Sequence, residues 1–233
     1  MSTAPAGGET GRIDPTGFIR ENLPIRTVPG IPEIRLHAAA PSSGLHRLAG
    51  KDEEAFGTPY WAYRWAGGLA LARHLLDHPQ SVAGLRVLDL GAGSGLVAIA
   101  AARAGARTVL AADVDPCALA ATRLNAALNR VSIATLEADL TAGAPPDVDL
   151  ILVGDLFYAE ELAKRVTAFL DRCLAAGRAA LVGDPWRRHL PTTRLIELAR
   201  YEVAEVGDRP SRASGVFAFR AGRAISPAAP DPC

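Results

Sequence analysis

The clearest structural signal in the chain is RVLDLGAGSG, at residues 86–95. A short apolar run of strand length ends in three alternating glycines, Gly91, Gly93 and Gly95, and an apolar helix-like run follows them directly. Glycine permits a tight turn and lets a ligand approach the backbone. The unpaired N–H groups at the start of the next helix point at whatever lies there. This strand–turn–helix unit predicts a ligand site beyond the carboxyl end of a parallel strand.

Strand and helix signals alternate on both sides of this unit. Further strands are expected at 33–39, 108–112, 132–138, 148–153, 178–182, 201–206 and 215–219. Helices are expected at 61–77, 96–104, 116–129, 160–174 and 191–199. Alternation favours a parallel sheet with right-handed crossovers, and the last two strands favour an antiparallel edge. We therefore expect an α/β fold with a doubly wound, mostly parallel seven-stranded sheet and an antiparallel C-terminal strand.

One domain accounts for most of the chain. Its 233 residues suit a single α/β domain with a sizeable core. We expect a flexible N-terminus over residues 1–30, a single domain over 31–220 and a disordered, Ala/Pro-rich tail over 221–233. Within the domain, 31–80 would form a covering segment with a helix, and 81–220 the sheet.

Composition excludes several classes of protein. The 25 basic residues balance the 25 acidic ones, so the chain lacks the basic footprint of a nucleic-acid-binding protein. The three cysteines are too widely spaced for a disulfide framework and suit a reducing compartment, and the histidines form no metal-ligand spacing with them. No apolar run reaches the ~18 residues of a membrane span, and no secretory signal is recognisable. The sequence thus predicts a cytoplasmic protein without a metal site, and with neither nucleic acid nor a membrane as partner.

The glycine turn distinguishes between two classes of cofactor. Dinucleotide sites follow G-x-G-x-x-G or A, whose last small residue lets helix and strand pack closely, but here that position holds Leu96. S-adenosylmethionine carries no phosphate, and its amino-acid end needs both donors and acceptors. Asp89, just before the glycines, can bind the ammonium of that end directly or through water. The pattern therefore favours S-adenosylmethionine over a nicotinamide cofactor.

Acidic residues also follow the later strands. Asp113, at the tip of the second parallel strand, can accept both ribose hydroxyls; alternatively it is a turn residue, and we expect Asp115 to cap the next helix. Asp139, after the third strand, is placed to accept from the adenine amino group, or is a turn aspartate. Asp155 and Tyr158 follow the fourth strand and would face the methyl group. The alternative there is a helix-entry aspartate with a packed tyrosine.

Several motifs taken together resemble a known family. They are PYWAYRWAGGLA at 59–70, the glycine turn, DVDP at 113–116, GDLFY at 154–158 and GDP at 183–185. In order and spacing they resemble the lysine methyltransferases of the electron-transfer flavoprotein β-subunit and their bacterial relatives, part of a wider group with a D-x-x-[YF] motif. The resemblance covers roughly residues 31–219.

The resemblance implies an S-adenosylmethionine-dependent N-methyltransferase acting on protein lysines, those of the electron-transfer flavoprotein β-subunit or of a similar protein. Trp61 is expected at the cofactor, and Trp65 and Phe157 at the substrate. Asp155 and Tyr158 would be catalytic. Asp155 would bind and orient the substrate nitrogen, with a proton-acceptor role left open, and Tyr158 would hydrogen-bond or wall the methyl path.

Departures from the family pattern leave the exact substrate open. Ala66 replaces a proline, Arg64 stands where an aromatic is common, and Trp186 where a small residue is common. Methyltransferases of a large-subunit ribosomal protein share the glycine turn and DVDP, but carry an Asn-Pro-Pro-type motif at the fourth strand. A small-molecule amine as substrate, or a non-catalytic cofactor-binding module, are the alternatives.

Overall fold

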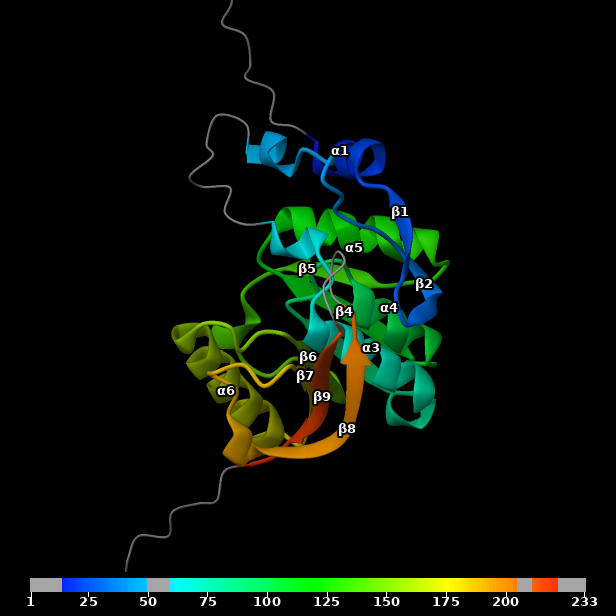
Figure 1. The fold of residues 1–233 in the computed structure, drawn as a ribbon. Helices are drawn as coiled ribbons and strands as arrows, with labels where there is room; N and C mark the ends of the chain where they lie inside the picture. Colours follow the sequence, from blue (N-terminus) through cyan, green and yellow to red (C-terminus); the bar gives the residue numbers. More distant parts are fainter. Residues whose placement is uncertain (1–13, 50–58, 205–210, 222–233) are drawn as a thin grey trace, which may run out of the picture.

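The computed structural model describes residues 14–49, 59–204 and 211–221. Its main sheet is built from β3 (Arg86–Leu90), β4 (Thr108–Asp113), β5 (Ala134–Glu137), β6 (Leu150–Gly154), β7 (Ala179–Asp184), β8 (Leu195–Val203) and β9 (Arg212–Phe219). The seven strands lie in the order β5-β4-β3-β6-β7-β9-β8 (Figure 1). β3 to β7 are parallel, and β9 runs antiparallel to both of its neighbours. This confirms the predicted sheet.

Helices cover both faces of the sheet. They are α3 (Ala66–Asp77), α4 (Leu96–Arg103), α5 (Pro116–Leu128) and α6 (Glu160–Ala175). Because side chains alternate along a strand, Val87 packs with α3 and α4 while Leu88 packs with α6 on the opposite face. Among the described residues, no helix combines the length and apolar character that a membrane crossing requires.

Residues 14–30 are folded, which corrects that part of the flexible segment expected over residues 1–30. Helix α1 (Pro15–Asn22) begins after the N-cap Asp14, and β1 (Ile25–Val28) pairs with β2 (Ile31–His37). An N-cap aspartate followed by proline is a helix-start signal that the sequence analysis passed over. Residues 1–13 and the expected tail from residue 222 lie outside the described residues.

Two helix predictions need correction. The helix expected at 191–199 is wrong: a 3-10 turn spans Thr192–Arg194, and β8 begins at Leu195. Pairing with β9 supplies the backbone hydrogen bonds of this segment, so the tertiary partner overrides the local pattern. The helix expected at 61–77 begins at Ala66, after a separate 3-10 turn (Tyr60–Ala62). Part of the strand expected at 201–206 lies outside the described residues.

Candidate functional site

The glycine turn lies between the end of β3 and the start of α4. Gly91, Gly93 and Gly95 have φ angles of +69°, +54° and +80°. This left-handed region disfavours any residue with a side chain, so the three glycines are needed for the shape of the turn. Gly91 N–H donates to Ala112 O at the end of β4 over 2.8 Å, which ties the turn to the neighbouring strand.

Two buried polar residues of α5 hold the turn from the other side. Thr122 Oγ1 donates to Gly93 O over 3.1 Å, and Asn125 Nδ2 donates to Ser94 O over 2.9 Å. Asn125 Oδ1 also accepts from His37 N–H at 2.8 Å, so one side chain links the turn to β2. The sequence analysis missed both residues, although two polar residues three apart on an otherwise apolar helix face were a usable signal.

Asp89 lies beneath the turn and caps the helix that follows. Its side chain is buried, and its Oδ2 accepts from Ala98 N–H in the first turn of α4 at 2.9 Å. Gly95, the N-cap of α4, has no side chain to do this. Burial raises the pKa of Asp89 to about 7, and the nearby Asp113 adds to the shift. The carboxyl group therefore titrates close to neutral pH.

Asp113 contacts the turn directly from the end of β4. Its Oδ2 accepts from Gly93 N–H at 2.9 Å, and its Oδ1 accepts from Asp115 N–H at 3.0 Å. The next side chain, Val114, is 66% exposed. Asp115 caps α5 by accepting from Cys117 N–H, which confirms that prediction. The carboxylate of Asp113 has spare lone pairs that can accept hydrogen bonds from a ribose. The exposed apolar side chain of Val114 beside it can pack against a base.

Asp139 has partners of its own. Its Oδ1 accepts from the backbone N–H and the hydroxyl of Thr141, and its Oδ2 pairs with Arg165 at 2.8 Å. It caps a 3-10 turn (Leu140–Ala142), as the turn alternative expected. An adenine amino group would have to share Oδ2 with Arg165, so this contact stays a prediction.

Asp155 is held at the end of β6 in a conformation uncommon for its residue type. Its φ is +62°, and the side chain is buried. Its Oδ2 accepts from Gly68 N–H at 2.6 Å and so caps α3, whose N-cap Trp65 provides no side-chain acceptor. Burial raises the pKa of Asp155, and the adjacent Arg187 guanidinium opposes that rise. The alternative of a helix-entry aspartate is therefore correct in that Asp155 caps a helix. That helix is α3, which is distant in sequence, and not the next helix along the chain.

Arg187 was missed by the sequence analysis. Its Nη1 pairs with Asp155 Oδ1 and lies 3.4 Å from Oδ2 of Asp184, the last residue of β7. Asp184 is completely buried, and its Oδ1 also accepts from Arg187 N–H at 2.7 Å. Its position two residues after the GDP motif was the available signal. The fourth and fifth parallel strands are therefore joined at their ends by one guanidinium between two carboxylates.

Four aromatic side chains, from the segment that precedes α3 and the segment that follows β6, form a rim: Tyr60, Tyr63, Trp65 and Tyr158. The Tyr60 ring centroid lies 5.8 Å from that of Tyr158 and 5.9 Å from that of Trp65. Tyr60 and Tyr158 are each 52% exposed. Burial of its inner part raises the pKa of Tyr158, with Tyr60 and Asp113 adding to the rise. The aromatic rim thus adjoins both Asp155, through the chain, and Asp113, through space.

The expected substrate contact of Phe157 is corrected by the structure. Its side chain is completely buried and packs in the cluster that contains Phe169 and Leu170 of α6. Asp155 turns the chain in the left-handed conformation, after which Phe157 enters the core while Tyr158 stays at the surface. Phe157 therefore stabilises the fold and cannot reach a substrate.

Trp61 lies against the glycine turn with an unused donor. A Cβ added to Gly93 would be 3.7 Å from Trp61 Cα. The Trp61 side chain is buried, and its Nε1 has no hydrogen-bond partner among the residues that the structure describes. A buried donor without a partner lowers the stability of a protein by about 1–3 kcal/mol. We therefore expect a ligand to supply a hydrogen-bond acceptor to this N–H. The carboxylate end of S-adenosylmethionine is an acceptor of the right kind, and the residues present fit this cofactor.

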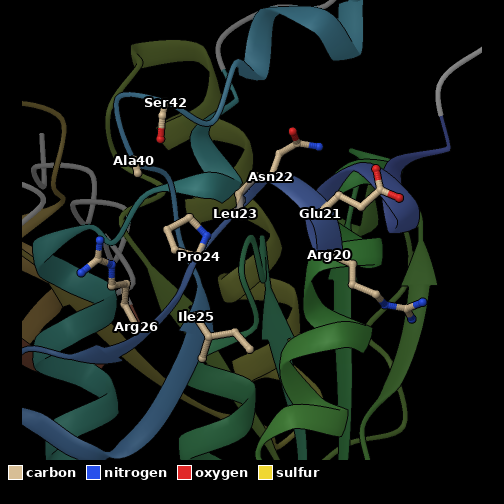
Figure 2. Close-up of a pocket in the computed structure, with 9 residues that line it drawn as sticks. All are labelled: Arg20, Glu21, Asn22, Leu23, Pro24, Ile25, Arg26, Ala40 and Ser42. Atoms are coloured by element: carbon tan, nitrogen blue, oxygen red, sulfur yellow. The ribbon is translucent and has the colours of Figure 1, made fainter.

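A separate surface pocket of about 490 Å³ is lined by none of these residues. Figure 2 shows its lining, which comes from the end of α1, the start of β1 and the link between them, and from Ala40 and Ser42. It contains none of the predicted site residues. Among the described residues, no three His, Cys, Asp or Glu side chains are grouped so as to hold a metal ion.

Comparisons with known proteins point to one chemistry. The family model for ribosomal protein L11 methyltransferases (PrmA) matches residues 70–176. The electron transfer flavoprotein beta subunit lysine methyltransferase of Xenopus laevis is 41% identical over 202 residues, covering 84% of this chain and 82% of that protein. The human protein of the same name is 38% identical over 195 residues, covering 78% and 71%. A putative RNA methyltransferase structure from Pyrococcus horikoshii shares the fold, with a TM-score of 0.51 and 15% identity over 71% of this chain and 89% of that one.

Proposed function

The chain belongs to the electron transfer flavoprotein β-subunit lysine methyltransferases, and from that premise we propose that it methylates a lysine of the electron transfer flavoprotein β-subunit or of a similar protein. It is an S-adenosylmethionine-dependent methyltransferase. The observation that carries the substrate proposal is the open aromatic rim. With Tyr60 and Tyr158 half exposed, the rim is open to a side chain presented by a folded protein.

We assign the cofactor to the surface formed by the glycine turn, Trp61, Asp89 and Asp113. The cofactor supplies a methyl group on a positively charged sulfur, which is already a strong electrophile. Trp61 Nε1 would donate to its carboxylate, and Asp89 would attract its ammonium. Each oxygen of Asp113 accepts one backbone N–H and keeps a lone pair for a ribose hydroxyl. Val114 offers an apolar surface to the base.

The remaining task of the chain is to align a neutral amine. Holding two reactants in line can lower a barrier by roughly 7–11 kcal/mol. A lysine amine with a pKa of ≈ 10.4 is neutral in only about one molecule in 2500 at pH 7. Partial burial in the aromatic rim would lower that pKa because it disfavours the charged form. Asp155 would bind and orient the nitrogen, and Tyr158 would line the route along which the methyl group is transferred.

An incubation with tritiated S-adenosylmethionine tests the proposal. The purified enzyme is added to an extract of its own host, and labelled protein is separated from labelled small molecules. We expect the label in protein, including the electron transfer flavoprotein β-subunit, and far less of it with Asp155→Asn. Label confined to small molecules would contradict a protein substrate. No label at all, from protein that binds the cofactor, would favour the non-catalytic alternative.

A further inference from the structure

The ends of β6 and β7 hold a nearly buried cluster of three charged side chains. Arg187 is 17% exposed, Asp155 9% and Asp184 0%, measured on their side chains. The backbone N–H groups of Gly67 and Gly68 in α3 also favour the ionised form of Asp155. Within the described part of the chain, the strongest charges acting on Arg187 are Asp155 and Asp184, and those acting on Asp184 are Arg187 and Asp155. The cluster therefore carries one net negative charge when all three groups are ionised.

A carboxylate alone would be a poor neighbour for the reacting nitrogen. An unopposed Asp155 would favour the ammonium form of a lysine, which has no lone pair with which to attack. A guanidinium keeps its charge across the whole working range of pH and cannot give up its proton. Placed on Oδ1 of Asp155, it offsets the attraction for ammonium. Each carboxylate oxygen has two lone pairs, so Oδ1 can still accept an N–H from a neutral amine.

On the basis of the proposed function, we infer that Arg187 is a positioning residue that fixes the Asp155 carboxylate and favours the neutral form of the substrate amine. The proton of the substrate ammonium leaves to bulk water. The nitrogen lone pair then forms the new N–C bond as the C–S bond breaks, and the product is a methylated ammonium. Neither Asp155 nor Arg187 has to take up the proton, and each carboxylate oxygen of Asp155 already has one hydrogen-bonding partner.

Single-turnover rates against pH, with cofactor and β-subunit saturating, separate this role from a purely structural one. Arg187→Gln removes the charge, Arg187→Lys keeps it, and Arg188→Gln removes an exposed neighbouring charge as a control. We expect the midpoint of the rising limb to move up by about one pH unit in Arg187→Gln, which is about tenfold in rate on that limb. It should stay near the wild-type value in the other two variants. The inference would be overturned if Arg187→Gln and Arg187→Lys lowered the single-turnover rate equally at every pH and left the midpoint of the rising limb unchanged.

A second measurement needs no methyl acceptor. Carbon-13 NMR of labelled aspartate carboxyls should show Asp155 and Asp184 both ionised at neutral pH in the wild-type protein. In Arg187→Gln one of the pair should take up a proton, because two close carboxylates then lack the intervening charge. An unchanged titration would contradict the charge offset. If the wild-type enzyme leaves the β-subunit unlabelled, the substrate proposal fails, whereas this titration still decides the role of Arg187.

Discussion

Gly67 and Gly183 meet backbone to backbone, at the point where α3 begins and β7 ends. A Cβ on Gly67 would lie 2.1 Å from Gly183 O, and a Cβ on Gly183 would lie 2.2 Å from Gly67 O. Asp155 N–H donates to the same carbonyl of Gly183 at 3.0 Å. The approach of these two glycines therefore sets the distance at which Asp155 caps α3.

Gly67→Ala should destabilise the protein by about 1–3 kcal/mol or more, because the new methyl group would force the start of α3 away from β7. Denaturant unfolding followed by circular dichroism measures the change. Gly143→Ala is the matched control, since a Cβ there meets its nearest atom at an ordinary 3.6 Å. Equal stability of the two variants would show that the close approach is not maintained.

Gly93→Val should abolish cofactor binding, because the added carbons occupy the surface of the turn that faces Trp61. Gly84→Val is the control: it has a similar backbone strain, with φ at +75°, but a Cβ there meets nothing within 4 Å. Calorimetric titration with S-adenosylmethionine compares the two. Unchanged affinity in Gly93→Val would remove the turn from the cofactor site.

Cofactor affinity should fall as the pH is lowered through about 7. In the free protein the pKa of Asp89 is raised to about 7, so below that pH the carboxyl is protonated and cannot attract an ammonium. Binding selects the ionised form, and the loss approaches tenfold for each further pH unit. Asp89→Asn should bind weakly and lose this dependence. Calorimetry from about pH 6 to 8 tests both statements, and a wild-type affinity independent of pH would contradict the role of Asp89.

Asp155→Asn should sharply lower turnover while cofactor affinity stays within a few-fold. It should also lower stability, because Arg187 then keeps only its longer ion pair, the one with Asp184, at a nearly buried position. The double variant Asp155→Asn, Arg187→Gln should recover neither turnover nor stability, because it leaves the completely buried Asp184 without its guanidinium. A methyl-transfer assay beside denaturant unfolding gives both quantities. Wild-type turnover in Asp155→Asn would exclude this carboxylate from the chemistry.

Phe157 and Tyr158 should behave oppositely although they are adjacent. Phe157→Ala empties a completely buried site and should cost about 3–5 kcal/mol of stability. Tyr158→Ala, at a half-exposed position, should change stability by no more than about 0.5 kcal/mol but raise KM for the protein substrate. If both variants lose stability equally, Tyr158 belongs to the core and the rim is misassigned.

Local patterns predicted most of the sheet. The glycine turn between β3 and α4 and the Asp115 cap depend on neighbours in sequence, and both are where the sequence placed them. The segment at 191–199 was misread because its partner, β9, lies further along the chain. The expected cytoplasmic location stays a prediction.

The contacts of the site were harder to foresee because they join distant parts of the chain. The direction of Phe157 follows from the left-handed conformation of Asp155, which no residue preference indicates at that position. Arg187 reaches Asp155 only because β6 and β7 end side by side. Asn125 links three segments that no local pattern relates. Sequence identified the carboxylates, but only the fold shows what each of them holds.

The central claim is that the cofactor lies on the glycine turn between Trp61 and Asp113, and a crystal structure with S-adenosylhomocysteine tests it most directly. The account predicts the amino-acid end on the turn, with Trp61 Nε1 donating to its carboxylate, and the ribose hydroxyls on Asp113. Density for the ligand in another place, such as the pocket in Figure 2, with the turn empty, would contradict it.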